Sequence, residues 1–473
     1  MSVTEKTIDF NSLEKLIFEK QCREGCKLLK EKLEQYGEDL KESRDKSIYR
    51  HKGLKKTTIK TIMGEVEYTR ALYEVVSEDG IKKYVYLLDQ AMGINGSGFM
   101  SGLLSGLIVK TACEGSYRST SRIISETTGQ PISHTAAWNV VQEIGNRIGI
   151  KEANAAEAAA NNEGAGELET PLLFEEMDGI WLNLQGKSRK EFGRNREMKL
   201  SIAYDGAERK GAKRYQLTNK VACAGFLPVG AFMKHKEGVI AGTYNTDEIR
   251  MRLLNGDGAS WIKSGITDES VHFQLDQYHI NNAIRKYVKN REMQKMITEY
   301  LYAKKIDGML ECIMLLSDSV SDDDEQDNLL SLYDYFSSNK SGLIPCHRRG
   351  LPIPPPSEGK VYRRLGAMES NVFTLVGNRM KGRRFCWSID GGNNMARILC
   401  LKVTGKLNDT LQSLTKIILP EKYAENIFSG LSAAKVPQLA GKGYEGYHKS
   451  FAPPKPEYKW LRGIGSMNLG DLI

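Results

Sequence analysis

Three acidic residues lie where an unpaired carboxylate would be costly. Asp178 interrupts the apolar run 171–185, and Asp257 lies between two glycines. Glu369 begins an amphipathic helical pattern that continues through Val372, Phe373 and Val376. Burying a carboxylate is unfavourable unless a cation pairs with it, so each position is a candidate for metal binding or catalysis. Hard oxygen ligands suit Mg²⁺, and two ions about 3.5–4 Å apart can support in-line displacement at phosphorus.

Each of these acids, taken alone, has an ordinary explanation. Single carboxylates commonly cap helices and strand ends. The combination of two Asp and one Glu, on two strands and a helix of one α/β unit, is what favours a metal site. Rival carboxylates are Glu176, Asp205 and Asp268, and alternation along a strand puts Glu176 on the same side as Asp178.

The elements that would position these acids form an α/β pattern. Three β-rich runs in quick succession predict an antiparallel meander: 171–185, 197–205 and 215–226. We expect a helix over 245–254 and a further strand over 271–276. Residues 281–340 are helical and polar, and the α/β pattern resumes at Val361. The helical block is therefore interpreted as an insertion inside one mixed-sheet domain.

The first 170 residues have a different character. Residues 11–45 predict an amphipathic helix, and 57–88 predict a β-hairpin module. Next comes a helix over 116–128, a break at 129–131, and a second helix capped by Ser133. A helix, a Gly-containing turn and a capped helix can form a helix-turn-helix, although an ordinary helical hairpin fits equally well. A linker poor in bulky residues, 152–170, follows, which we interpret as a solvated helix end or a flexible joint.

Composition limits the class of protein. With 473 residues, 40% hydrophobic and 27% charged, the chain is too long for one core and too apolar to be disordered, so we expect two to four packed units. No run approaches the roughly 18–20 apolar residues of a membrane helix, and residues 1–10 do not resemble a secretion signal, so we expect no membrane partner and a cytoplasmic location. The eight cysteines are spaced as reduced, buried thiols rather than as a disulfide or zinc framework.

Charge is distributed unevenly along the chain. The net charge is only +8, but residues 341–473 hold 20 Lys and Arg against 9 Asp and Glu. The last third is therefore the part whose charge favours contact with an anionic polymer.

Three segments carry a resemblance to a known family: GDGASWIK (256–263), QLDQYHINNAIRK (274–286) and the long run 366–399. Together they resemble the ISLre group of bacterial insertion-sequence transposases, which is also filed as an uncharacterised protein family and is more distantly similar to Mutator-like DDE transposases. The resemblance covers nearly the whole chain. It implies an RNase H-like catalytic core with an all-helical insertion between the second Asp and the Glu.

The resemblance also assigns roles to residues. It implies that Asp178, Asp257 and Glu369 are the catalytic, metal-binding triad. Asp276 and His279 match the Asp-x-x-His pattern that follows the second acid in the Mutator-like relatives, although a single His is more often structural.

DNA contacts are expected at two places. The start of the second helix of the helix-turn-helix, with Ser133, His134 and Thr135, would face base edges. A basic group after Glu369 would hold the DNA backbone, since guanidinium groups pair well with phosphates; its members are Arg379, Lys381, Arg383 and Arg384. The alternative is a solvated charged face. Trp387 is a candidate for stacking on a base, with a core position as the alternative.

The sequence thus predicts a DDE transposase that binds double-stranded DNA at the terminal inverted repeats and at the target. We expect two Mg²⁺ or Mn²⁺ ions, a homo-oligomer on DNA, and association with the nucleoid. The alternatives are a non-catalytic, decayed DNA-binding protein and an RNase H-like structure-specific nuclease. The expected segments are a helix and hairpin module (1–100), a helix-turn-helix and linker (101–165), the core in two parts (166–280 and 356–410) around a helical insertion (281–355), and a basic tail (411–473).

Overall fold

The structure is a computed structural model. It describes residues 9–77, 79–93, 100–161, 166–212, 214–382 and 385–414. The expected basic tail lies almost wholly outside the described residues. Within them, no helix combines the length and the apolar character that crossing a membrane requires.

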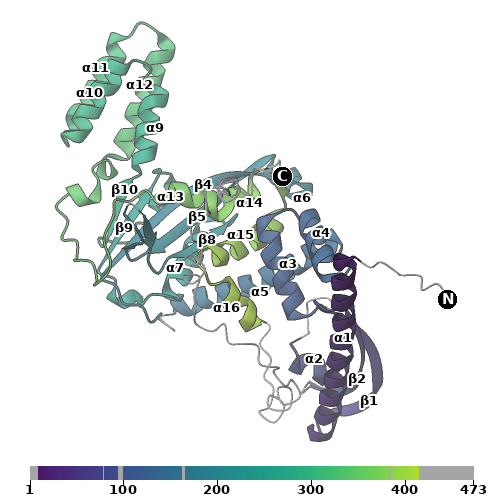
Figure 1. Cartoon of the computed structure of the whole chain (residues 1–473). Coiled ribbons are helices and arrows are strands. Elements are labelled where there is room, and N and C mark those ends of the chain that lie inside the picture. Colours follow the sequence, from purple (N-terminus) through teal and green to yellow (C-terminus); the bar gives the residue numbers. More distant parts are fainter. Residues whose placement is uncertain are drawn as a thin grey trace, which may run out of the picture. The chain divides into compact units, whose positions relative to one another are not determined.

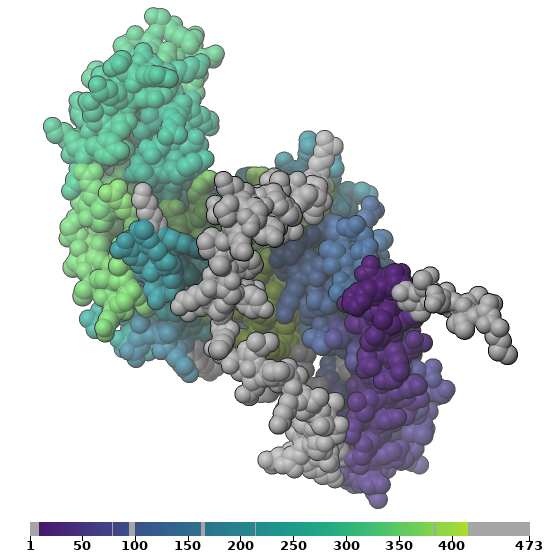
Figure 2. Space-filling view, viewed as in Figure 1, coloured from purple at the N-terminus to yellow at the C-terminus, as the bar shows by residue number. Residues whose placement is uncertain are grey.

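The N-terminal module combines one long helix with a small antiparallel sheet. Helix α1 (Phe10–Ser43) starts at Asp9, whose side chain accepts the N–H of Ser12. Strands β1 (Arg50–Lys60), β2 (Glu65–Val76) and β3 (Lys82–Val85) pair in that order, and α2 (Leu87–Ala91) follows. The predicted hairpin is confirmed, but Leu87 and Leu88 begin a helix rather than continue a strand. Only the second half of α1 contributes buried residues; its first half, purple in Figure 2, exposes Phe10, Leu13 and Ile17.

Three helices come next: α3 (Gly102–Glu114), α4 (Tyr117–Thr128) and α5 (His134–Ala160). The predicted break is present, because Gly129 ends α4 with φ +67° and the Ser133 hydroxyl accepts the N–H of Ala136 at the start of α5. Helix α5 continues into the predicted linker as far as Ala160. It does so because Gly238 of α7 (Val229–Ala241) lies directly against Ala156, which is buried there.

The largest sheet of the described residues is mixed and is covered by helices (Figure 1). Its order is β10-β9-β4-β5-β8, in which β4, β5 and β8 are antiparallel neighbours and β9 and β10 extend the sheet parallel to β4. The strands are β4 (Leu172–Leu184), β5 (Asn195–Tyr204), β8 (Val221–Gly225), β9 (Met251–Gly256) and β10 (Val271–Leu275). Short elements between them are α6 (Gly186–Phe192), β6 (Ala207–Arg209), β7 (Tyr215–Leu217), η1 (Thr246–Glu248) and α8 (Ser260–Lys263). The predicted meander is confirmed in β4, β5 and β8.

The prediction of a helix over 245–254 is wrong. That stretch contains the short turn η1 and then β9, while the helix before it is α7. The reason is tertiary: β9 lies between β4 and β10, so both its edges are hydrogen-bonded and Leu253 and Leu254 are buried on opposite faces of the sheet.

Helices cover both faces of this sheet. Leu172, Phe174 and Leu182 pack into a core shared with α3, α5 and α15 (Ile389–Val403). Met177 and Phe273 face a second core, shared with α7 and the helices after β10. Alternation along β4 therefore gives each face its own core.

The predicted helical insertion begins directly after β10. Its helices, drawn together in Figure 1, are α9 (Gln277–Tyr287), α10 (Arg291–Tyr302), α11 (Ile306–Ser319) and α12 (Asp323–Ser338). The turns η2 (Lys340–Gly342) and η3 (Cys346–Arg348) follow α12 along the chain. Ile280, Ile297, Met309 and Phe336 are fully buried among them. The insertion thus brings its own apolar contacts.

The chain then returns to the sheet. A continuous helical stretch runs through α13 (Met368–Val372), the π-helical turn η4 (Phe373–Gly377) and α14 (Asn378–Met380). Strand β11 (Cys386–Trp387) adds to the far end of β4, and α15 and α16 (Leu407–Leu414) follow. Val376 is buried against the sheet as predicted, but Phe373, where the π-helical turn begins, is 61% exposed.

Candidate metal centre

The pairing of the parallel strands brings acidic residues to one edge of the sheet. Strand β4 pairs Leu172 with Met251 and Glu176 with Asn255 of β9, so partners are 79 positions apart. The same spacing separates Asp178 from Asp257. Strand β10 ends beside β9, and Asp276 directly follows it. The carboxyl ends of adjacent parallel strands are where α/β proteins usually bind ligands.

Two carboxylates and one imidazole lie close together at this edge, and we call them the acidic group. Asp178, His279 and Glu369 each offer a ligand atom, and these atoms lie within 4.8 Å of one another. Asp178 and His279 are half-buried, whereas Glu369 is exposed. The group joins three elements, β4, α9 and α13, that are distant along the chain. Its donors, two carboxylates and an imidazole, fit a divalent cation.

Asp257 lies beside this group rather than within it. Its negative charge raises the pKa of Asp178, so the two carboxylates interact electrostatically. Its own Oδ1 accepts the N–H of Ala259 at 2.8 Å, and its backbone oxygen accepts the hydroxyl of Tyr335 on α12 at 2.8 Å. Gly258 leaves no room for a side chain, since a Cβ there would meet Asn339 at 2.3 Å. The insertion therefore packs directly on the turn that carries Asp257.

The surroundings of Asp178 disfavour a negative charge that no cation neutralises. Its pKa is raised to about 6, mainly by burial and also by the neighbouring charges of Asp257 and Glu369. The N–H of Gly179 and the charge of His279 act in the opposite direction. The ionised form is thus disfavoured in the metal-free protein, and a bound cation would reverse this.

Asp276 positions His279. It caps α9, with Oδ1 accepting the N–H of Tyr278 at 2.8 Å, and its Oδ2 accepts the amide of Asn255 at 2.6 Å. Asp276 is almost fully buried, so its carboxylate fixes the start of α9 against β9. His279 lies in the first turn of that helix and is held towards Asp178.

Glu176 positions Glu369. Its carboxylate accepts the backbone N–H groups of Gly366, Ala367 and Met368 at 3.0–3.1 Å. It also accepts the hydroxyl of Tyr204 at 2.6 Å and the amide of Asn255 at 3.0 Å. Burial raises the pKa of Glu176, while the bonds from Tyr204 and the backbone lower it. This rival carboxylate is therefore the anchor for the start of α13.

The other two rival carboxylates are engaged elsewhere. Asp205 is buried and is held by Lys360, Thr218 and Asn219. Asp268 accepts the N–H of Ser270 in an exposed turn, which lowers its pKa. Neither residue belongs to the tight group with Asp178.

The expected basic group after Glu369 is only partly available. The prediction that Arg379 holds the DNA backbone is wrong, because this residue is only 6% exposed. Its Nε donates to the backbone oxygen of Ala112, and its guanidinium lies over the rings of Tyr117 and Trp387. It holds α14 to α3 and does not face DNA. Lys381 is exposed, whereas Arg383 and Arg384 lie outside the described residues.

Two further expectations concern surface exposure. Trp387 is buried and donates from Nε1 to the backbone oxygen of Met380, so its alternative interpretation as a core residue is the one the structure supports. Ser133, His134 and Thr135 are all exposed at the start of α5, where a ligand can reach them.

Asn255 was not identified from the sequence. It is fully buried, and its amide nitrogen lies between Glu176 and Asp276. One residue therefore couples the two carboxylates that position Glu369 and His279. The only hint in the sequence is a polar residue two positions before Asp257 in an apolar run.

These features describe a mixed α/β protein with an acidic centre at the carboxyl ends of its parallel strands. The chain belongs to the uncharacterised protein family UPF0236, whose model matches residues 3–414. Similar proteins are known from Caldanaerobacter subterraneus subsp. tengcongensis. The UPF0236 protein TTE2489 is 24% identical over 395 residues, covering 83% of this chain and 77% of its own length. The UPF0236 protein TTE0402 is 24% identical over 395 residues, covering 83% of this chain and 73% of its own length.

Proposed function

We propose that this protein is a DDE-type DNA transposase that binds insertion-sequence ends and catalyses metal-dependent strand cleavage and strand transfer. The observation that carries the proposal is the meeting of Asp178, Glu369 and His279, with Asp257 beside them, where the parallel pairing of β4 with β9 ends. Phosphoryl transfer needs little covalent chemistry from a protein, because positioning and charge stabilisation supply most of the catalysis.

The fold supports the same proposal. A six-stranded mixed sheet carries the first acid on its strand β4 and the second directly after β9, the parallel neighbour of β4. A helical insertion then separates the second acid from Glu369. This is the arrangement that the resemblance to ISLre transposases implies for an RNase H-like core.

The names of relatives add an independent argument. One similar protein of Caldanaerobacter subterraneus subsp. tengcongensis, 23% identical over 395 residues, carries eleven locus designations in its name, and another carries four. A protein found at many loci of one organism is what an element that inserts copies of itself would produce. This distribution favours a mobile element over a nuclease that repairs DNA.

The roles follow from the geometry. Asp178 and Glu369 would hold one or two divalent ions, Mg²⁺ or Mn²⁺, with Asp257 and His279 at their edge. Such ions, when bound, activate the attacking oxygen and stabilise the leaving one. Asp276 and Glu176 fix the two helices that bring His279 and Glu369 to the site.

DNA recognition is proposed for the helices before the sheet. The capped start of α5, with Ser133, His134 and Thr135 exposed, is the part that would enter a groove of the terminal repeats. Because two element ends must be joined, we propose a homo-oligomer assembled on double-stranded DNA, in the nucleoid.

A cleavage assay tests the proposal. Purified protein with Mg²⁺ should nick the DNA that flanks its own gene at the element ends, and Glu369→Gln should lower this rate by at least about a hundredfold, because it removes a charge that holds the ions. Glu358→Gln, at an exposed residue outside the site, is the matched control. Binding without nicking would identify a non-catalytic DNA-binding protein, and cutting regardless of terminal sequence would identify a structure-specific nuclease.

The affinity for Mn²⁺ is predicted to depend on pH. Because the pKa of Asp178 is raised to about 6, the carboxylate is ionised at pH 7–8 and the affinity should change little there. Below pH 6 a cation must displace its proton, so the apparent Kd should rise by about tenfold per pH unit. Titration calorimetry at pH 5.0, 6.0 and 7.5 measures this. A Kd that is unchanged between pH 7.5 and 5.0 would contradict the assignment of Asp178 as a ligand.

A further inference from the structure

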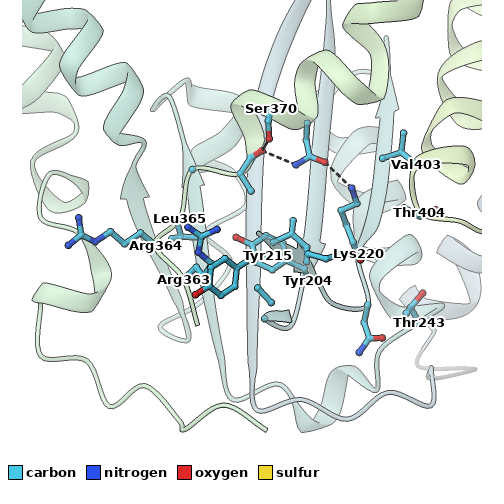
Figure 3. A pocket seen from close by; sticks show the side chains of 18 of the residues that line it. Tyr204, Tyr215, Lys220, Thr243, Arg363, Arg364, Leu365, Ser370, Val403 and Thr404 are labelled. Carbon is cyan, nitrogen blue, oxygen red and sulfur yellow. Dashed lines mark hydrogen bonds between the residues drawn. The ribbon is translucent and has the colours of Figure 1, made fainter. Parts of the chain in front are cut away.

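A cavity of about 780 Å³ lies against the helix that carries Glu369. Ser370 and Asn371, the two residues after Glu369, line it, and so do Gly366 and Ala367 before α13. Neighbouring helical residues point about 100° apart, so one turn of α13 presents Glu369 to the metal centre and its neighbours to the cavity. Figure 3 shows this cavity, here called the basic pocket, with Ser370 at one end and Tyr215 near its middle.

The basic pocket is positively charged. Lys220, Arg363, Arg364 and Lys406 line it, and none of its lining residues is acidic. The ion pairs of the described residues leave all four cations out. The nearby carboxylate of Asp205 is already held by Lys360. The positive charge of the pocket is therefore uncompensated.

Lys220 is the cation that a ligand must enter the pocket to reach. Its side chain is half-buried, and its Nζ donates to Oδ1 of Asn371 at 3.0 Å (Figure 3). Burial lowers the pKa of Lys220, because the ammonium has lost water and gained only a neutral partner. An anion beside it would restore the lost stabilisation.

The rim adds groups that suit a nucleotide. The Arg363 guanidinium lies over the ring of Tyr215, 4.3 Å from its centre, and is exposed on its other side. The exposed Lys406 donates to the hydroxyl of Thr243 at 2.8 Å on the opposite wall. Amide groups of Gln216 and Asn219 also face the pocket, and they can bond the edge of a base.

We propose that the basic pocket binds a single phosphorylated nucleotide of a DNA strand that has left the duplex beside the metal centre. Ligand pockets commonly enclose about 300–1,000 Å³, and this one has room for one nucleotide. A base-paired duplex occupies more than one nucleotide's space, so we expect it to contact only the rim. The location beside the scissile bond rests on the proposed function, whereas the chemistry of the ligand rests on the pocket alone.

Binding of a fluorescein-labelled (dT)10 strand, in EDTA and by anisotropy, tests the pocket without metal chemistry. Lys220→Met and Arg363→Gln should each raise the Kd by about fivefold or more and lower the slope of log K against log salt by about 0.7, since each removes one phosphate contact. Arg291→Gln, at an exposed residue of α10, is the matched control and should leave both unchanged. Arg363 lies on the rim, so its variant tests the pocket even if Lys220→Met folds poorly.

Two further arms identify the ligand. Free dTMP that displaces (dT)10 from the wild type but not from Arg363→Gln would support recognition of one nucleotide, and failure of dTMP to compete at millimolar concentration would overturn it. A blunt duplex of the same length should be much less sensitive to both variants. Equal losses for strand and duplex, or no loss for either variant, would overturn the proposal. These results are independent of cleavage, so the pocket and the proposed transposase activity can fail separately.

Discussion

Replacing Asp178 with asparagine is expected to abolish metal-dependent DNA cleavage and to stabilise the metal-free protein. Cleavage should fall by about a thousandfold or more, because Asp178 is the most buried carboxylate of the group that would hold the ions. Stability should rise because burial and the charges of Asp257 and Glu369 disfavour the ionised carboxylate. Binding of element ends should persist, since Asp178 is distant in the chain from the proposed DNA-reading helices.

The sign of the stability effect follows from the pKa. The pKa of Asp178 is raised from 3.8 to about 6 in the folded protein, so its ionisation above pH 6 opposes folding. Asparagine removes this charge and keeps an oxygen for the N–H of Gly179, so at pH 8 the free energy of unfolding should increase by about 1–3 kcal/mol. Below pH 4 the gain should vanish. Urea unfolding in EDTA at both pH values measures it.

Asp318→Asn is the matched control for this variant, because Asp318 is exposed on α11 and is outside the acidic group. It should change neither cleavage nor stability. If Asp178→Asn weakens end binding as much as it weakens cleavage, or destabilises the protein at pH 8, the carboxylate has a structural role and the metal centre is wrong.

Replacing Glu176 with glutamine is expected to cause the opposite change in stability with the same loss of activity. The carboxylate accepts three backbone N–H groups, the Tyr204 hydroxyl and the Asn255 amide in a fully buried site. Glutamine turns one oxygen into a donor that faces other donors. The free energy of unfolding should fall by about 2–4 kcal/mol, because a buried group then lacks its partner. Cleavage should fall as well, since the start of α13 holds Glu369.

Tyr204→Phe separates this effect from a simple loss of packing. It removes one of the five donors and leaves the carboxylate in place, so the free energy of unfolding should fall by only about 1 kcal/mol. Urea unfolding of the two variants gives the comparison. A cost for Glu176→Gln no larger than that for Tyr204→Phe would mean that the carboxyl is not the hydrogen-bonded anchor of α13.

The two variants show that neighbouring carboxylates of the centre affect stability in opposite ways. Asp178 lowers stability because it is buried beside other negative charges. At Glu176, two residues earlier on the same face of β4, the hydrogen bonds from Tyr204 and the backbone oppose the cost of burying the carboxylate. Strand alternation predicts that both residues face the same side. It does not predict which one will receive the donors.

Local patterns predicted most of the elements correctly. The strands of the meander, the helices of the insertion and the Ser133 cap can each be recognised from a short stretch of chain, and all of them are present. The helix prediction for 245–254 is wrong because β9 is short and is stabilised by strands on both sides. The prediction for Arg379 is wrong for a similar reason. Nothing in the residues around it along the chain indicates that it will be buried against α3.

The sequence by itself determined which residues could do chemistry, because carboxylates in apolar runs and an Asp-x-x-His pattern can be recognised along a single stretch of chain. Only the tertiary structure decided which of them meet. The register of β9 on β4 sets Asp178 level with Asp257, and it depends on hydrogen bonds between strands 79 positions apart. The group of Asp178, His279 and Glu369 and the anchoring role of Glu176 depend on contacts between β4, α9 and α13, and the basic pocket depends on segments that are just as distant along the chain.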